Sequence, residues 1–412
     1  MALARASQGH RRRVQSHAHG YWQPAARAVG RRSPPYGSIA PEVCQARACA
    51  SPIALTIIGH SKRQLAVNIL LVRLSAIGDV LFATPLIDAL RRRYPEAKID
   101  WLVQPECAPL LECHPDLNDV LIWPRQEWLT LWRHRRLLTL ARRVLAFRRR
   151  LRAERFDLAL DLQGLMKSGL LTWLSGAPKR VGLGSREGSR WLMTRVLPRG
   201  GDSRRIGSEY RFLAETLELS TGEFRMALHT APEDRAFAAA QMQEQGLDEG
   251  YVVLCPFTTR PQKHWVESRW AELAAELARD FELPSVLLGA PADRVAADRI
   301  LAAGTSNIVC LVGQTSLREA AAVIERARLV IGVDTGLGHM GIALARPTLL
   351  LFGSTRPYLD TGRANAHVLY HALSCSPCRR EPTCDGRFMC MRLITVAECL
   401  AAARCVLAPE AA

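Results

Sequence analysis

The chain has 412 residues, of which 48% are apolar and 6% aromatic, and this is enough for two domains with cores of ordinary size. Its formal net charge is +16, and no apolar stretch approaches the roughly 18 residues that a membrane-spanning helix needs. These totals exclude an integral membrane protein. The twelve cysteines form no even framework, which excludes a small secreted disulfide-rich domain and favours a reducing, cytoplasmic setting.

Residues 1–66 differ in composition from the rest of the chain. They hold ten basic residues and one acid, Glu42, so that this segment carries +9 and the remaining chain only +7. Without a sustained helix or strand period they cannot offset the entropy of ordering, and we expect a disordered basic extension. An organellar transit peptide would have this composition, but an upstream start codon explains it better, because no Met lies between Met1 and Met166.

Alternating strands and helices begin at Val67. The apolar pattern predicts a strand at 68–74, a helix at 80–94 and a second strand at 99–103, which together form a βαβ unit. Parallel sheets bind ligands at the carboxyl ends of their strands. The turn between the first strand and the first helix is therefore a candidate site, and its residues include Ser75, Gly78 and Asp79.

The segment 125–155 is the most basic of the chain, with eleven arginines against two acids. Apolar residues recur between the arginines, which predicts an amphipathic helix or helix pair with an arginine-rich face. Such a face is either solvated or binds phosphates, carboxylates or an acidic membrane, and the pattern leaves both open. A strand at 156–161 follows, and Gln163 and Lys167 lie just past its end, where they could contact a ligand.

A second series of strands and helices starts at Tyr251. Because the two halves repeat one plan, we expect an α/β protein with two doubly wound domains that face each other across a central cleft. The expected parts are domains at 67–240 and 248–355 and a cysteine-rich tail, 356–412, that packs back on them. Within the second domain, Ser316 and Glu319 form a predicted capping box at the start of a helix.

A glycine-rich turn, 334-DTGLGH-339, follows a predicted strand at 329–333. Glycines let backbone N–H groups approach a phosphate where a helix begins. We expect Asp334 to hold the turn or a ligand hydroxyl, and His339 to donate to a phosphate or to cap its helix. The tripeptide Asp-Thr-Gly also occurs in aspartic proteases, but those need two such carboxylates in all-β lobes, and this one lies between α/β elements.

Asp79 is the leading catalytic candidate, although it could instead cap the first helix. A helix N-terminus weakens a carboxylate as a base. This matters little if the hydroxyl proton leaves late, together with a good leaving group. Lys263 and the turn at 334–339 would stabilise a departing diphosphate without a metal.

Five segments of the chain together resemble a known family. They are 71-LVRLSAIGDVLFATPLIDALRRRYP-95, 161-DLQGLMKS-168, 258-TTRPQKHW-265, 289-GAP-291 and 334-DTGLGHM-340. In this order and spacing they resemble the heptosyltransferases of bacterial lipopolysaccharide synthesis, glycosyltransferase family nine. The resemblance implies an inverting transferase of the GT-B fold that moves L-glycero-D-manno-heptose from ADP-heptose to an inner-core sugar and requires no cofactor.

The resemblance also assigns roles to single residues. It implies that Asp79 is the general base for the acceptor hydroxyl and that Lys263 contacts the donor diphosphate. Further donor contacts are implied at Thr258, Thr259, Asp293, Asp334, Thr335, Gly336, Leu337 and His339. Asp293 departs from the pattern, since the family often has Glu there for the adenosine ribose. Acceptor contacts are expected at Ser75, Gly78, Arg133, Arg135, Arg136, Gln163 and Lys167.

The matches at 161–168 and 263–265 favour the enzyme that adds the first heptose to Kdo of Kdo2-lipid A. The phosphates and carboxylates of that acceptor suit the arginines of 125–155, at the cytoplasmic face of the inner membrane, and no nucleic-acid partner is expected. Alternatives are a later-heptose or other nucleotide-sugar transferase of the same family, and a non-catalytic anion-binding protein on acidic membranes. In the tail, Cys375, Cys378, Cys384 and Cys390 could hold a zinc ion, although their spacing is not that of a standard ribbon.

Overall fold

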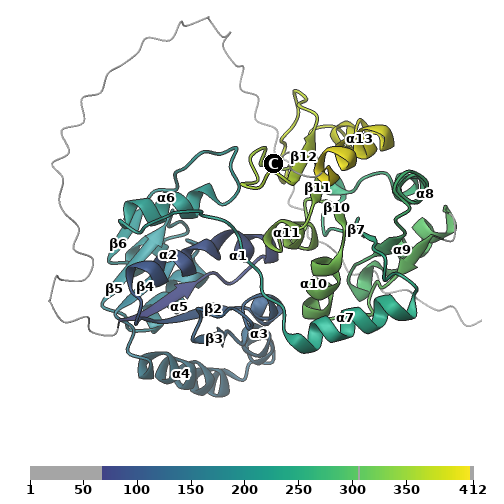
Figure 1. The fold of residues 1–412 in the computed structure, drawn as a ribbon. Helices are drawn as coiled ribbons and strands as arrows, with labels where there is room; N and C mark the ends of the chain where they lie inside the picture. Colours follow the sequence, from purple (N-terminus) through teal and green to yellow (C-terminus); the bar gives the residue numbers. More distant parts are fainter. Residues whose placement is uncertain (1–66, 305–306, 409–412) are drawn as a thin grey trace, which may run out of the picture. The chain divides into compact units, whose positions relative to one another are not determined.

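A computed structural model describes residues 67–304 and 307–408, so the expectations for residues 1–66 lie outside the described residues. Its framework is two six-stranded sheets, the first built by β1–β6 and the second by β7–β12 (Figure 1). All strand pairs in both sheets are parallel, and helices alternate with the strands. The predicted α/β class with two doubly wound units is therefore confirmed.

The first sheet has the strand order β3-β2-β1-β4-β5-β6. Its strands are β1 (Asn68–Val72), β2 (Lys98–Val103), β3 (Asp119–Ile122), β4 (Leu158–Asp161), β5 (Lys179–Leu183) and β6 (Arg195–Leu197). Its helices are α1 (Ile77–Ala83), α2 (Pro85–Arg93), α3 (Arg125–Arg133), α4 (Leu137–Ala153), α5 (Met166–Leu174) and α6 (Ser208–Thr216), with short 3-10 turns η1 (Pro105–Leu110) and η2 (Ser189–Leu192).

The second sheet has the order β12-β11-β10-β7-β8-β9. Its strands are β7 (Val252–Cys255), β8 (Ser285–Leu287), β9 (Ile308–Cys310), β10 (Leu329–Val333), β11 (Thr348–Phe352) and β12 (Ala366–Tyr370). The helices of this half are α7 (Pro232–Glu244), α8 (Glu267–Phe281), α9 (Arg294–Ala302), α10 (Leu317–Arg326), α11 (Gly336–Ala343), α12 (Met389–Arg392) and α13 (Val396–Leu407), with 3-10 turns η3 (Pro261–Lys263) and η4 (Pro291–Asp293).

The single helix predicted at 80–94 is two helices in the structure. It begins earlier, at Ile77, and it breaks at Thr84 because Pro85 has no N–H to continue the ladder of hydrogen bonds. The segment 125–155, for which either one helix or a helix pair was predicted, forms the pair α3 and α4. The capping box of α10 is present. Ser316 Oγ accepts a hydrogen bond from the Glu319 N–H at 3.2 Å, and the Glu319 carboxylate accepts one from the Ser316 N–H at 2.7 Å.

Apolar side chains of both halves form the core. One cluster of buried residues joins the two halves, and two further clusters cover the second faces of the sheets. The connection between the halves runs through 217–231 into α7, which packs along α10 of the second half (Figure 1). The tail continues the second half: β12 adds a strand beside β11, and α13 packs on α8.

Candidate active site

The predicted site residues follow the central strands of the two sheets. In each sheet the strand order reverses at one place, between β1 and β4 in the first and between β10 and β7 in the second. Ligands of doubly wound sheets bind at such reversal points, beyond the carboxyl ends of the strands. Ser75, Gly78 and Asp79 follow β1 and Gln163 follows β4, whereas Lys263 and Asp334 follow β7 and β10.

Asp79 lies in the first turn of α1, where its carboxylate pairs with a buried arginine. Arg73 Nη2 lies 2.6 Å from Asp79 Oδ2, with exposed fractions of 6% for the arginine and 43% for the aspartate side chain. Arg73 also donates to the Leu162 carbonyl at 3.2 Å, which ties it to the end of β4. The arginine therefore fixes one carboxylate oxygen and leaves an exposed part of the carboxylate toward solvent.

The end of β4 is bonded to the end of β1. The Leu74 N–H donates to Gln163 Oε1 at 3.0 Å, and the N–H of Gln163 donates to the buried Asp161 carboxylate at 3.1 Å. Gln163 thus supports the turn after β1. Lys167, on α5, is half-buried, and its pKa is lowered, first by burial and then by the positive charge of Arg125.

Lys263, Asp334 and His339 form a chain of contacts in the second half. Lys263 Nζ lies 2.6 Å from Asp334 Oδ2, and His339 Nε2 lies 3.0 Å from Asp334 Oδ1. Burial alone would raise the pKa of Asp334, but the hydrogen bond and charge of His339 and the Lys263 ammonium outweigh it and hold that pKa well below its usual range. Nδ1 of His339 is buried without a hydrogen-bond partner, so one ring nitrogen is left for another group.

The two halves meet where α1 packs against α11. A Cβ on Gly78 would lie 2.9 Å from His339 Cδ2, and a Cβ on Gly336 would lie 2.5 Å from Ile77 Cγ2. No side chain larger than hydrogen fits at either glycine without a shift of its neighbour. This contact brings the turn that carries Asp79 next to the turn that carries Asp334 and His339.

Aromatic side chains from both halves surround His339. Phe82 of α1 contacts the ring edge-on, with ring centroids 4.8 Å apart, and Tyr358 packs on both Phe82 and Phe352. Burial raises the pKa of Tyr358, and the charges of Asp334 and Asp79 raise it further. The Tyr358 hydroxyl therefore interacts electrostatically with the carboxylates of both Asp334 and Asp79.

The other predicted donor residues lie around the same strand ends. Thr258 and Thr259 lie in the loop after β7, where the Thr258 carbonyl contacts His264 Nε2 at 2.8 Å. Thr335, Gly336 and Leu337 form the start of α11. Asp293 ends η4, after β8, and its carboxylate accepts from the Ala290 N–H at 2.9 Å, so it supports its own turn.

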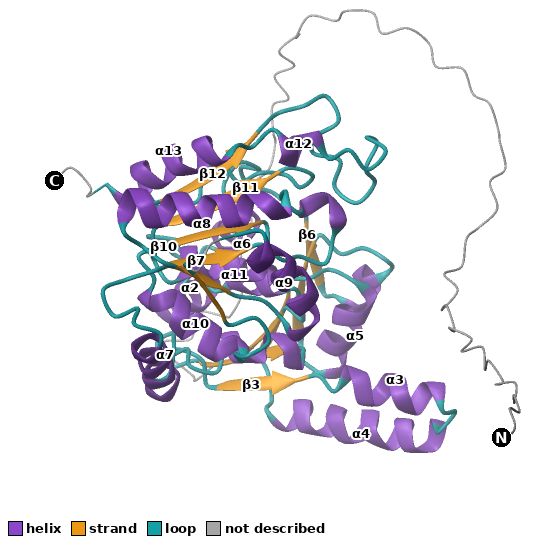
Figure 2. Ribbon diagram, turned by 90° about the vertical axis from the view of Figure 1, so that its right-hand side faces the viewer, coloured by secondary structure: helices purple, strands orange, loops and turns teal. Residues whose placement is uncertain are grey.

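Three predicted acceptor residues do not join this group. Arg133 ends α3, and Arg135 and Arg136 form the turn to α4, at the outer end of the hairpin in Figure 2. All three are exposed, and within the described chain no hydrogen bond or ion pair links them to Asp79 or Gln163. Their role in acceptor binding stays a prediction.

Sequence reasoning missed Arg73 and Tyr358. A charged residue inside the apolar run 69–74 was the available signal for Arg73, because a buried charge in a strand needs a partner. Tyr358 lies in the loop after β11, and nothing in its local sequence marks it. Arg125 was also missed as the arginine whose charge acts on Lys167.

The predicted zinc ligands of the tail are not arranged as a metal site. Among the residues that the structure describes, no three Cys, His, Asp or Glu side chains are placed to hold a metal ion. Cys375, Cys378 and Cys384 are half-buried free thiols, and Cys390 is a buried one. Burial raises the pKa of the Cys390 thiol, and the neighbouring thiols Cys378, Cys375 and Cys384 raise it further.

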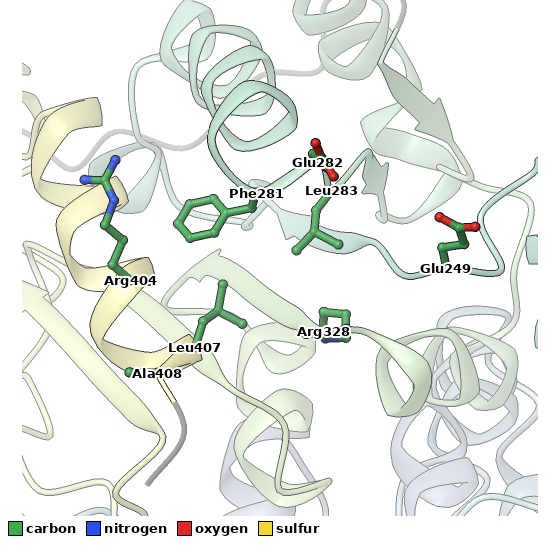
Figure 3. Close-up of a pocket in the computed structure, with 8 residues that line it drawn as sticks. All are labelled: Glu249, Phe281, Glu282, Leu283, Arg328, Arg404, Leu407 and Ala408. Carbon is green, nitrogen blue, oxygen red and sulfur yellow. The ribbon is translucent and has the colours of Figure 1, made fainter. Parts of the chain in front are cut away.

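A cavity of about 460 Å³, shown in Figure 3, is lined by none of the candidate active-site residues. Its wall includes Phe281, Leu283, Arg328, Arg404 and Leu407. Leu283 and Arg328 precede β8 and β10, so the cavity opens at the amino-terminal edge of the second sheet. Since ligands of such sheets bind at the opposite edge, the strand ends at Asp79 and Asp334 remain the candidate active site.

Known proteins share both the sequence and this architecture. The family model described as glycosyltransferase family 9 (heptosyltransferase) matches residues 144–387. The chain belongs to glycosyltransferase family 9. Lipopolysaccharide heptosyltransferase 1 of Pseudomonas aeruginosa is 31% identical over 77% of this chain and 87% of its own length. The family resemblance expected from the five motifs is thus confirmed, and the protein is a glycosyltransferase.

Solved structures of family 9 members show the same fold. The family 9 glycosyltransferase of Veillonella parvula superposes with a TM-score of 0.72 at 21% identity, covering 83% of this chain and 98% of that one. Heptosyltransferase WaaC of E. coli, solved with ADP-2-deoxy-2-fluoro heptose, gives a TM-score of 0.61 at 27% identity, covering 81% of this chain and 98% of that one. Among the described residues of the family 9 chain, no helix is both long and apolar enough to cross a bilayer.

Proposed function

We propose that this protein transfers L-glycero-D-manno-heptose from ADP-heptose to Kdo of Kdo2-lipid A, with inversion at the anomeric carbon. The observation that carries the proposal is the α1–α11 contact, which sets the Asp79 turn beside the Lys263–Asp334–His339 chain. The similarity to heptosyltransferase 1 supports the choice of donor and acceptor. The acceptor would bind the first half, next to Gln163 and Lys167, at the cytoplasmic face of the inner membrane.

Asp79 would take the proton of the acceptor hydroxyl as its oxygen attacks the anomeric carbon. The bond from that carbon to the β-phosphate oxygen breaks, and the electron pair leaves with ADP. Lys263 and the free N–H groups at the start of α11 would stabilise the negative charge that develops on the diphosphate. The ammonium of Lys263 already lies against Asp334, so donor binding would divide its hydrogen bonds between the two anions.

Thr258, Thr259, Asp293 and His339 would hold the rest of the donor. The unpartnered Nδ1 of His339 supports a contact to a ligand. The chemistry uses only side chains and backbone of this chain, and we propose no cofactor.

The test is turnover of purified protein with ADP-heptose and Kdo2-lipid A, followed by ADP release and the mass of the lipid product. We expect Asp79→Asn to bind donor normally but to lose about 10²- to 10⁴-fold in rate, the usual contribution of a general base. Lys263→Ala should lose both rate and donor affinity.

Melting curves of both variants control for folding, because Lys263 also neutralises a buried carboxylate. If Asp79→Asn kept the wild-type rate, the assignment of the base would be wrong. If the wild-type protein neither bound nor turned over ADP-heptose, the donor would be another nucleotide sugar. If it bound ADP-heptose but did not transfer to Kdo2-lipid A, the acceptors of later heptoses would be tested next.

A further inference from the structure

Exposed apolar side chains gather on one part of the first half, outside the candidate active site. Of fourteen exposed large apolar side chains in the described chain, eight lie on α3, α4, α5 and η2. They are Trp132, Leu137, Leu138, Leu145, Met166, Leu170, Trp173 and Trp191. We refer to the surface of α3, α4, α5 and η2 as the docking face.

Helix α5 contributes an apolar stripe to the docking face. Met166, Leu170 and Trp173 follow one another at intervals of four and three residues, so they lie on one side of the helix, and they are 41%, 43% and 42% exposed. The opposite side of α5 buries Leu171 and Leu174 in the core. A surface helix of a soluble protein ordinarily presents polar residues on its outer side, which α5 does not.

Trp191 of η2 belongs to the same surface. A Cβ on Gly169 of α5 would lie 2.8 Å from Ser189 Cβ, so η2 packs directly against α5. Trp191 is 82% exposed, and among the described residues its ring is stacked only with the Arg190 guanidinium, which lies 5.2 Å from the ring centroid. A tryptophan beside an arginine at an exposed position is typical of the interface between lipid and water.

Helix α4 adds positive charge and further apolar side chains. Leu138, Arg142, Leu145 and Arg149 are spaced by four and three residues along one side of the helix, and all are exposed. Arg142 and Arg149 form no ion pair or hydrogen bond with any described residue.

The acids near α4 are already neutralised. Glu127 pairs with Arg143 at 2.9 Å, and Asp119 pairs with Arg150 at 3.6 Å. The side of α4 that carries Arg142 and Arg149 is therefore positively charged.

The two parts of the docking face adjoin each other and the candidate active site. A Cβ on Gly176, just after α5, would lie 3.1 Å from Arg152 Nε of α4, and Figure 2 shows α5 beside the hairpin. At its other end, α5 carries Lys167, one of the proposed acceptor contacts, next to Met166. The apolar stripe thus begins where an acceptor would be held.

We propose that the docking face binds the surface of a bilayer that contains anionic lipids. The arginines of α4 meet lipid phosphates, while Leu138, Leu170, Trp173 and Trp191 enter the boundary between headgroups and acyl chains. A bilayer supplies both the negative charge and the apolar layer that this face lacks. A second copy would instead bring two arginine-rich faces together, which charge repulsion opposes. The inference rests on the proposed function only in that the acceptor is a lipid.

The first test is flotation of the full chain with vesicles of phosphatidylcholine alone or with 30% phosphatidylglycerol added. The apolar variant carries Leu170→Ser and Trp173→Ser, and the charge variant carries Arg142→Gln and Arg149→Gln. A basic residue at an acidic surface contributes about fivefold to membrane affinity, so the charge variant should bind the anionic vesicles about 25-fold less tightly. The apolar variant should lose at least about tenfold on the same vesicles, because two side chains no longer enter the lipid.

A matched control carries Val295→Ser and Arg380→Gln, two exposed residues of the second half, and should bind within about twofold of the unchanged chain. Every sample contains residues 1–66, because this segment has a net charge of +9. Any attraction of this segment to anionic vesicles is then the same in all variants. Melting curves confirm that each variant folds. Wild-type vesicle binding by both variants would overturn the proposal, as would light scattering that showed a dimer dissociated by either variant.

A second readout separates this proposal from the proposed function. With a water-soluble acceptor that lacks acyl chains, the docking variants should transfer at the wild-type rate, whereas with acceptor embedded in vesicles they should be slower. If no form of the protein transferred heptose while vesicle binding changed as expected, the proposed function would fail and the docking face would stand. If the docking variants lost the same fraction of their transfer rate with the soluble and with the embedded acceptor, the substitutions would have damaged the active site. That result would overturn the assignment of these residues to docking.

Discussion

At the scale of single residues, His114 should make stability depend on pH. It is 5% exposed, its ring contacts His229 edge-on, and its Nδ1 accepts from the Asp116 N–H at 3.2 Å, which requires a neutral nitrogen. Burial, together with the charge of His229, lowers the pKa of His114 from 6.5 to about 4. Because the unfolded chain binds this proton more readily, the stabilising effect is complete above pH 6.5 and is lost as the pH falls toward 4.

The measurement is the free energy of unfolding in urea between pH 7.5 and pH 4. His114→Asn keeps an oxygen that can accept from Asp116 and removes the titration, so its curve should fall less than that of the wild type by about 3 kcal/mol over this interval. His134→Asn, at an exposed histidine in the α3–α4 turn, is the control and should match the wild type. Parallel wild-type and His114→Asn curves would contradict the prediction.

The residues that sequence reasoning identified were those whose role depends on position next to a strand end. Asp79, Gln163, Lys263 and Asp334 all follow apolar strands, and parallel topology gathers such positions. Their partners could not be predicted in the same way. Lys263 and Asp334 are 71 residues apart in sequence, and nothing local to either specifies that they meet.

At the scale of secondary-structure elements, α13 should depend on its capping box. Thr395 Oγ1 accepts from the Glu398 N–H at 3.2 Å, and Glu398 accepts from the Thr395 N–H at 2.7 Å. The helix then packs on α8, while the Ile394 carbonyl accepts from Trp265 Nε1 at 2.9 Å. We expect Thr395→Ala to lower the free energy of unfolding by about 1 kcal/mol, measured by urea unfolding, with transferase activity retained. Thr395→Ser keeps the hydroxyl and should be close to wild type, and equal losses in both would exclude capping as the cause.

Elements with strong local signals agree with their predictions. The strand at 329–333 and the helix after Ser316 lie where expected, because a buried apolar run and a capping box are both local. The break at Thr84 and the strand β12 were not predicted. The helical apolar pattern continues across Pro85, and β12 is partly exposed at a sheet edge, so its sequence has little of a buried strand's character.

At the scale of the whole molecule, the two halves depend on glycine where α1 meets α11. Gly336→Ala would place a Cβ 2.5 Å from Ile77 Cγ2, and overpacking of this kind costs about 1–3 kcal/mol. We expect transfer to fall by about tenfold or more, measured as ADP release, because the turns of Asp79 and Asp334 can no longer approach each other as closely. Ile77→Gly removes both obstructing atoms, Cγ2 at 2.5 Å and Cβ at 2.7 Å, so the double variant should regain most of the activity. A double variant as slow as Gly336→Ala would indicate that the backbone contact, not the packing, had been damaged.

The connection through 217–231 has a consequence for the integrity of the molecule. In the described chain it is the one passage between the halves, since β12 and α13 stay with the second sheet after the chain has entered it. A single proteolytic cut in that segment would therefore yield two fragments, each with a complete sheet and neither threaded through the other. They would be held together by side-chain contacts such as Arg318 with Glu112 and Phe82 with His339. Under the proposed function, the donor and the acceptor would then be bound by separate polypeptides.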